Sequence, residues 1–175
     1  MQPSPYGSNA KFNSHYFPLH LALVSVGENF LPMGNWTVIG KDPFRFLLAM
    51  GVGNHSLTLL KKHKEAALHF FPWSEREWIV RAGHLSGRDV NKAQLLGRSL
   101  LPAQKLTATR LVAGYEAVFE LVVNRELSML SREFALFVMD CVASDGNIEP
   151  QQRQPILFLS QEDFATLGER WEYTK

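Results

Sequence analysis

Residues 51–58, of sequence GVGNHSLT, are the first segment whose residue types and spacing favour ligand binding. Two glycines precede Asn54 and Ser56, and the leucines that follow predict the start of a helix. Glycine lets a backbone approach a ligand closely, and unpaired N–H groups at a helix start attract an anion. The segment therefore predicts a phosphate site. A capped turn is the more common alternative, because the pattern matches neither the P-loop nor the G-x-G-x-x-G fingerprint.

Two other segments offer complementary chemistry. Residues 34–37 combine an amide, an indole ring and a hydroxyl at the start of a short strand, which suits a flat heteroaromatic ligand. A turn followed by a core tryptophan is the equally common alternative. Residues 86–92 place Arg88 and Lys92 ahead of a short helix, where one cation could neutralise a phosphate. The alternative for this segment is a solvated surface loop.

The other reactive side chains form no known catalytic or metal-binding pattern. The six histidines lack metal-ligand spacing, and the sequence has no G-x-S-x-G nucleophile motif. Cys141, the single cysteine, lies in an apolar stretch, where a buried inert thiol is expected. We therefore assign no metal and leave the catalytic residues unknown. Because no side chain stands out as a general acid or base, chemistry carried by a bound cofactor is favoured.

Length and composition predict one domain. The chain has 175 residues, of which 46% are hydrophobic, and residues 1–16 form a polar, turn-rich arm ahead of it. With 18 basic and 17 acidic side chains, the formal charge of +1 argues against nucleic-acid binding. No apolar stretch approaches the roughly 18 residues that span a membrane, and no signal peptide is expected. One cysteine fits a reducing compartment, so a cytoplasmic protein is expected.

Apolar alternation and turn residues predict the elements that must position these segments. The predicted strands cover residues 19–26, 35–39, 44–50, 66–71, 115–123, 134–143 and 156–159. Helices are predicted over 57–64, from a Ser74–Glu77 capping box to about Ala82, within 87–100, and as a helix or turn over 162–171. Strands that outnumber helices and do not alternate with them favour a β-rich α+β fold, an antiparallel sheet closed into a small barrel.

The two long strands differ in the cover that they require. In residues 115–123, one face is apolar and the face that carries Glu116 and Glu120 is expected to be partly wet. In residues 134–143, both alternating faces are apolar apart from Asp140. This strand is therefore expected to be covered on both sides, by the core on one and by helices or a second subunit on the other.

Taken in order over residues 17–167, these segments resemble the flavin reductase-like family, the FMN-binding split barrels that include flavoredoxin. Residues 86–92, SGRDVNK, are similar to the family's S-G-x-D-x-D-K, with Lys92 at the lysine that reaches FMN. Thr58 resembles the threonine that closes the R-x-x-Y-T phosphate loop. Thr37 matches the threonine of the N-x-M-T segment along the isoalloxazine, and Phe158 lies where the family has an aromatic residue near the flavin.

Four positions depart from the family pattern. Gly34 stands where the family has asparagine, although Asn35 is adjacent, and Asn91 replaces an aspartate. Phe134 and Met139 replace a histidine and a glycine. These departures keep open a split barrel that binds other ligands and has lost flavin.

The resemblance implies a Greek-key split barrel with short peripheral helices over residues 17–175, assembled as a homodimer with FMN near the subunit interface. It implies an oxidoreductase of the flavin reductase type, which takes hydride from a transiently bound NAD(P)H and passes electrons to flavin, a ferric complex or a partner protein. A flavoredoxin-like FMN electron carrier is the alternative. Together with the segments above, it predicts cofactor contacts at Asn35, Trp36, Thr37, Val38, Gly53, Asn54, His55, Ser56, Thr58, Lys92 and Phe158.

Overall fold

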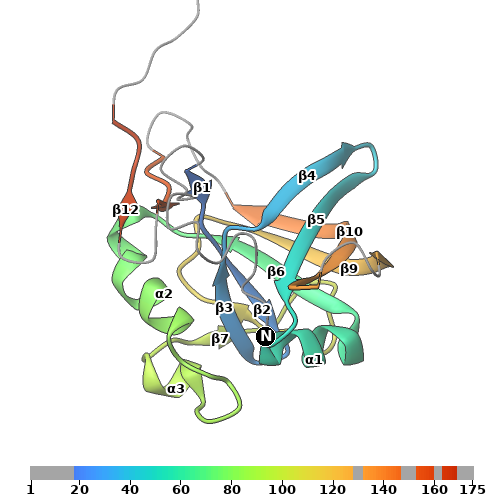
Figure 1. Cartoon of the computed structure of the whole chain (residues 1–175), viewed down its shortest axis with the longest axis horizontal. Helices are drawn as coiled ribbons and strands as arrows, with labels where there is room; N and C mark the ends of the chain where they lie inside the picture. Colours follow the sequence, from blue (N-terminus) through green and yellow to red (C-terminus); the bar gives the residue numbers. More distant parts are fainter. Residues whose placement is uncertain (1–17, 128–131, 147–152, 160–162, 169–175) are drawn as a thin grey trace, which may run out of the picture.

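The computed structural model describes residues 18–127, 132–146, 153–159 and 163–168. Its centre is a seven-stranded sheet in which every neighbouring pair is antiparallel. The sheet curls so that the β4–β5 hairpin turns away from β2 and β3 (Figure 1). In spatial order its strands are β3 (Asn29–Met33), β2 (Ala22–Val26), β6 (Glu65–Phe70), β9 (Ala117–Leu127), β10 (Phe134–Gly146), β5 (Phe44–Gly51) and β4 (Trp36–Lys41). The prediction of a β-rich α+β split barrel is confirmed.

Two small sheets complete the strand structure. One joins β1 (Leu19–His20), β11 (Leu157–Phe158) and β12 (Phe164–Ala165), which brings the two ends of the described chain together. The other pairs β7 (Leu100–Leu101) with β8 (Leu111–Val112). The loop between β7 and β8 covers part of the outer surface of the main sheet, where Leu106 and Leu111 pack on Val118 of β9.

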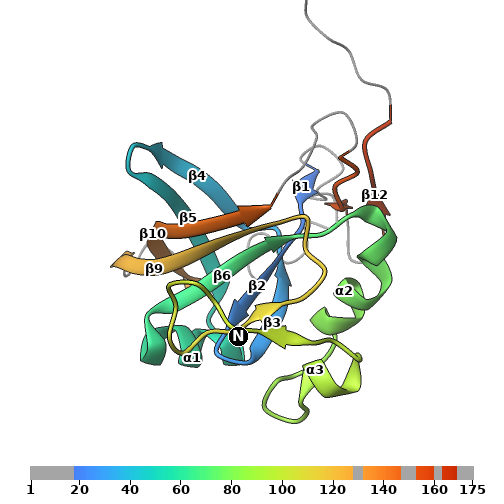
Figure 2. The same ribbon diagram turned by 180° about the vertical axis from the view of Figure 1, so that it is seen from behind.

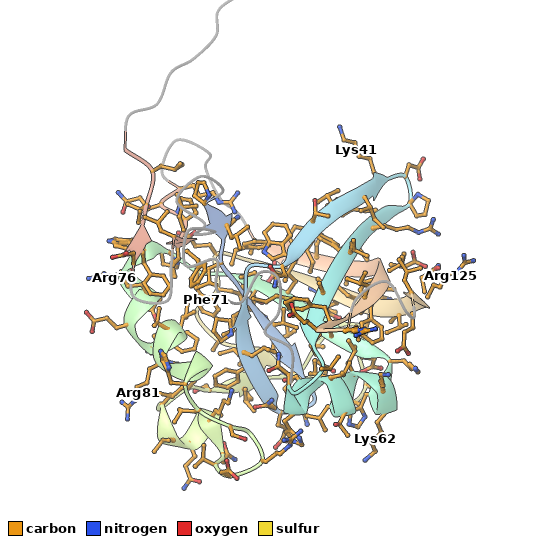
Figure 3. All side chains as sticks on the ribbon, in the orientation of Figure 1. Lys41, Lys62, Phe71, Arg76, Arg81 and Arg125 are labelled. Carbon is orange, nitrogen blue, oxygen red and sulfur yellow. The ribbon has the colours of Figure 1, made fainter. Side chains whose placement is uncertain are left out.

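Short helices cover the sheet at its margins, as Figures 1 and 2 show from opposite sides. Helix α1 (His55–His63) follows β5 directly, and Leu57 and Leu60 face the barrel core. A 3₁₀ turn, η1 (Trp73–Glu75), leads into α2 (Arg76–Gly83), and α3 (Lys92–Leu95) follows after a loop. Helix α2 buries Trp78, Ile79 and Ala82 in a second core beside Phe30 of β3. Charged side chains such as Lys62 and Arg76 point outward (Figure 3).

The secondary structure differs from the sequence prediction in several details: β7 and β8 were not predicted, and the predicted strand 19–26 divides into β1 and β2. Strand β3 was not predicted, because Pro32 cannot donate to a ladder; β3 tolerates it as an edge strand. The capping box at Ser74 is wrong: α2 begins at Arg76, and Glu75 accepts a hydrogen bond from the Trp78 indole instead. Within 162–171, the described residues 163–168 contain strand β12 rather than a helix.

The two long strands also distribute their burial differently from the prediction. Glu120, predicted on a partly wet face of β9, is only 1% exposed because the β7–β8 loop covers that face. In β10, Phe137 and Met139 lie in the core, whereas Leu136 and Val138 on the opposite face are partly buried. Cover on both sides of β10 is thus not complete within the described residues. The predicted arm, residues 1–16, lies outside them.

No helix in the described part of the chain is long and apolar enough to cross a membrane.

Candidate functional site

Three neighbouring cavities that share lining residues, together termed the groove, lie beside β3 and β4. The polar cavity, about 350 Å³, lies between the start of α1 and residues 83–92. It shares Pro32, Gly83 and His84 with a central cavity of about 580 Å³, lined by side chains of β1, β11, β12 and α2. The central cavity shares Leu19, Gly34 and Asn35 with a strand cavity of about 530 Å³ over β4 and β5. The groove therefore joins all three segments that the sequence singled out.

The polar cavity contains the start of helix α1. Asn54 is the N-cap residue, but its side chain makes no capping hydrogen bond to the described residues. The first turn contains no acidic side chain, and Gly53, Asn54, His55 and Ser56 line the cavity. The positive end of the helix dipole is thus not offset by a carboxylate of its own first turn, which favours a negatively charged ligand.

Half-buried Asn29 and buried Ser56 form a hydrogen-bonded pair in the lining of the polar cavity. Asn29 Nδ2 donates a hydrogen bond of 2.8 Å to Ser56 Oγ, and Ser56 is 1% exposed. The hydroxyl oxygen accepts this bond, so Ser56 keeps its own proton to donate to another group. Asn29 Oδ1 is buried and has no hydrogen-bond partner among the described residues. A donor and an unused acceptor therefore lie side by side in the cavity wall.

The two cations of residues 86–92 occupy different environments. Lys92 is 5% exposed, and its Nζ donates to Phe30 O at 2.8 Å and Ala82 O at 2.9 Å. Burial lowers the pKa of the Lys92 ammonium to about 8, so it stays protonated at neutral pH. Arg88 is exposed and its Nη2 donates to Gly53 O at 3.3 Å, from one side of the polar cavity to the other. The solvated surface loop that was the alternative for this segment therefore fits Arg88 but not Lys92.

The strand cavity is mainly apolar and holds the ring-binding candidates. Asn35, Trp36 and Thr37 line it together with Leu47 and Ala49 of β5. The Trp36 indole is fixed because its Nε1 donates to His20 O at 2.8 Å and its ring packs edge-on against Phe70. Trp36 is thus partly a core side chain and partly a wall of the cavity.

The remaining predicted residues are placed as follows. Phe158 lines the central cavity and packs edge-on against Phe164 at a centroid separation of 5.7 Å. Among the described residues that line the three cavities, neither Val38 nor Thr58 is present. Val38 is 42% exposed on β4, and Thr58 lies on the exposed side of α1.

Sequence reasoning missed several residues of the groove. Asn29 lies outside the segments singled out in the sequence, and its partnership with Ser56 depends on the unpredicted strand β3. His84 and Phe164 reach the groove from segments without a local motif, so no sequence signal identified them. The described residues contain no group of three His, Cys, Asp or Glu side chains that could hold a metal ion.

Neither a protein-family model nor a curated protein sequence matches the chain significantly. Solved structures do match. An FMN-binding protein from Thermus thermophilus, crystallised with bound p-hydroxybenzaldehyde, is 23% identical with a TM-score of 0.80, covering 91% of this chain and 92% of that one. Flavoredoxin of Desulfovibrio vulgaris (Miyazaki F) is 14% identical with a TM-score of 0.81, covering 99% and 97%.

A third match is an NADH:FAD oxidoreductase from Streptomyces globisporus, 16% identical with a TM-score of 0.72, covering 87% of this chain and 88% of that one. At these identities the likeness establishes the fold. The chain has the split-barrel fold of flavin reductase-like proteins, and the resemblance seen in its sequence is confirmed at that level.

Proposed function

We propose that the chain binds FMN along the groove and functions as a flavin-dependent oxidoreductase. The observation that carries the proposal is the polar cavity, where the unneutralised start of α1, the Ser56 hydroxyl and the Arg88 guanidinium surround one space. These groups together suit a phosphate. Asn29 lines the same cavity with its Oδ1 buried against Gly87 and unpartnered among the described residues, so a turn of its amide would let it accept a ribityl hydroxyl of FMN.

The far end of the groove fits the ring of the cofactor. Asn35 and Thr37 offer an amide and a hydroxyl beside the apolar side chains Leu47 and Ala49. A flat heteroaromatic ring needs this combination, because its faces are apolar and its edges form hydrogen bonds. Gly34 also lines this end, and a Cβ there would lie 3.0 Å from Leu19 Cβ. Glycine at position 34, where the family has asparagine, therefore leaves room for Leu19 to pack closely on the connection between β3 and β4.

The reaction we propose is electron transfer from NAD(P)H to flavin, a ferric complex or a partner protein. When bound, FMN would supply the redox chemistry, as a hydride acceptor and electron donor. The chain's own residues bind the phosphate, orient the ring against β4 and exclude water with Leu47, Ala49 and Phe158. The NADH:FAD oxidoreductase among the structural matches supports a nicotinamide donor, and the flavoredoxin supports a carrier without that donor as the alternative.

We further propose a homodimer that covers the outer face of β10, β5 and β9. Register places Val138 opposite Leu47, and Leu136 opposite both Ala49 and Leu127, on this face. All five side chains are apolar and partly buried. The strand cavity borders the same face through Leu47 and Ala49, so a second copy would also close the ring end of the groove.

Reconstitution tests the cofactor. Purified protein mixed with FMN should keep a flavin spectrum through gel filtration, and colourless protein without measurable affinity would show that the barrel has lost flavin. Anaerobic titration with NADH and NADPH then separates the two redox functions. Bleaching of the bound flavin identifies a reductase and its donor, whereas a flavin reduced only by dithionite or a protein donor identifies a carrier.

Light scattering tests the dimer. The unsubstituted chain should have twice the 19.8 kDa chain mass at micromolar concentration, and Val138→Lys should return it to one chain mass. Leu95→Lys, at an exposed position on α3, is the matched control and should leave the mass unchanged. A single-chain mass for the unsubstituted protein would rule out the dimer.

A cytoplasmic location, proposed from the single free Cys141, is tested by cell fractionation.

A further inference from the structure

The loop of residues 84–92 carries two cations, and their contacts differ in kind. Lys92 donates two short hydrogen bonds to main-chain oxygens, Phe30 O on β3 and Ala82 O in the last turn of α2. Both bonds are buried, and they tie the first residue of α3 to two other elements. A ligand could recruit this ammonium fully only by leaving buried carbonyls without a donor, which costs free energy.

Arg88 has a different position. Its guanidinium makes one long hydrogen bond, 3.3 Å, to an exposed carbonyl, Gly53 O. Five N–H donors are available on a guanidinium, and a pair of them matches two oxygens of a phosphate. Turning Arg88 toward a bound phosphate therefore gives up little, and Arg88 already spans the mouth of the polar cavity beside Asn54 and His55.

The backbone on either side of Arg88 is held in place. Gly87 packs directly on Asn29, because a Cβ at Gly87 would overlap Asn29 Oδ1. Four residues after Arg88, Lys92 anchors the end of the loop. The loop therefore presents Arg88 from two fixed points, one formed by Gly87 and one by Lys92.

We infer that Arg88, rather than Lys92, is the cation that pairs with the phosphate of the flavin, and that Lys92 is a positioning residue whose charge fixes the loop. This inference rests on the proposed function, since it assigns roles within the FMN groove. It also departs from what the sequence resemblance implies for Lys92. The phosphate then distinguishes FMN from riboflavin through Arg88, Ser56 Oγ and the start of α1.

Flavin fluorescence titration tests the inference with FMN and riboflavin as paired probes. Arg88→Gln should weaken FMN binding by about ten- to a hundredfold, the range for a charge-assisted hydrogen bond, and leave riboflavin binding and Tm unchanged. Added salt should weaken FMN binding to the unsubstituted chain more than to this variant, because an exposed ion pair is screened. Arg81→Gln is the matched control: Arg81 points outward from α2 (Figure 3), and its loss should change neither affinity.

Lys92→Met separates the two roles. Loss of the buried ammonium should lower Tm, while the folded protein keeps its preference for FMN over riboflavin. A Lys92→Met variant that loses the preference at unchanged Tm would overturn the inference, as would an Arg88→Gln variant that keeps the preference. The Arg88→Gln measurement decides the question if Lys92→Met does not fold.

Failure of the proposed function gives a different result. If the unsubstituted chain binds neither FMN nor riboflavin, the chain is not a flavoprotein and the assignment of Arg88 is also wrong. If it binds FMN and riboflavin equally well, flavin binding stands, and the phosphate role of Arg88 is wrong.

Discussion

Two loops of this molecule hold polar groups in opposite ways. Three N–H groups of the β7–β8 loop, those of Gln104, Lys105 and Leu106, donate hydrogen bonds to the buried carboxylate of Glu120 on β9. The next amides along the loop, including Ala108 N at 2.8 Å, donate to Glu65. Consecutive backbone donors are thus satisfied by two carboxylates on neighbouring strands of the sheet.

Around the loop of residues 84–92, polar groups of the loop, of β3 and of the start of α1 are left open where they line the groove. Asn29 Oδ1 has no partner among the described residues, Asn54 does not cap α1, and Arg88 makes one long bond. Buried polar groups are normally satisfied because an unpaired one costs free energy. The β7–β8 loop thus uses its polar groups for stability, whereas the proposed function assigns the open polar groups of the groove to a ligand.

The largest expected effect tests the structural half of this contrast. Glu120→Gln replaces one carboxylate oxygen by an NH₂ that faces N–H donors, and it should lower the free energy of unfolding by about 3 kcal/mol, because a hydrogen bond to a charged acceptor is lost and a buried N–H is left without a partner. Urea unfolding measures it. Glu77→Gln, at an exposed position on α2, should change stability little. If Glu120→Gln instead weakens FMN binding in protein that remains stable, the two loops are not functionally distinct.

A second effect on stability, which also comes from a buried polar side chain, depends on pH. His69 is fully buried; its Nδ1 bonds to Leu23 O at 3.1 Å and its Nε2 accepts from Val112 N at 3.1 Å. Burial lowers the pKa of His69 from 6.5 to about 4. The unfolded chain therefore binds more protons between these values, so stability is complete above pH 6.5 and falls as the pH drops toward 4.

The expected loss from His69 is up to about 3 kcal/mol, since one pKa unit corresponds to about 1.4 kcal/mol. His69→Gln can keep both hydrogen bonds without titrating, so its unfolding free energy should vary less over this pH range. The difference between the two pH profiles, from urea unfolding, isolates the histidine from the carboxylates. Parallel profiles would mean that His69 titrates normally and is not held neutral by the core.

The sequence predicts the elements whose structure depends on residues that are neighbours in the sequence, and it misses those that depend on tertiary contacts. The alternation in β5 and the glycines and leucines after it identified both the strand and α1, because periodicity and turn chemistry are local signals. Strand β3 escaped because its pairing with β2 overrides the breaking tendency of Pro32. A Ser74 cap was outweighed by the bond between Glu75 and the Trp78 indole.

The site shows the same division between local and tertiary signals. The three segments that line the groove were identified from residue types that suit phosphate and ring binding. The roles of the two cations could not be predicted from the sequence. Lys92 donates hydrogen bonds to carbonyls that lie 62 and 10 residues away, and only the tertiary fold brings these groups together. Asn29 carries no motif, and only its tertiary contact with Ser56 makes it a candidate.

Substitution of Gly87 is expected to affect stability less than the changes at Glu120 and His69, and to act mainly on FMN binding. Gly87→Ala places a methyl group where Asn29 Oδ1 lies, so the Asn29 side chain must move and its bond to Ser56 Oγ is lost. Stability should fall by about 1 kcal/mol, the value of one hydrogen bond, while FMN affinity falls by about tenfold or more. Gly168→Ala, where a Cβ meets open space, is the control. Equal losses of FMN and riboflavin affinity would place the disturbance at the ring or the ribityl hydroxyls, which the two flavins share, rather than at the phosphate.

The smallest effect compares two hydroxyls on α1. Ser56 is 1% exposed and lines the polar cavity, whereas Thr58 is exposed and lies outside the described lining of that cavity. Ser56→Ala removes the donor that Asn29 orients and should weaken FMN binding by about tenfold. Thr58→Ala should leave affinity unchanged and alter stability by no more than about 0.5 kcal/mol, as expected for a surface substitution. The reverse result, with Thr58 required and Ser56 dispensable, would move the phosphate to the exposed side of α1, where the sequence resemblance places it, and would leave the unused acceptor of Asn29 without a ligand to explain it.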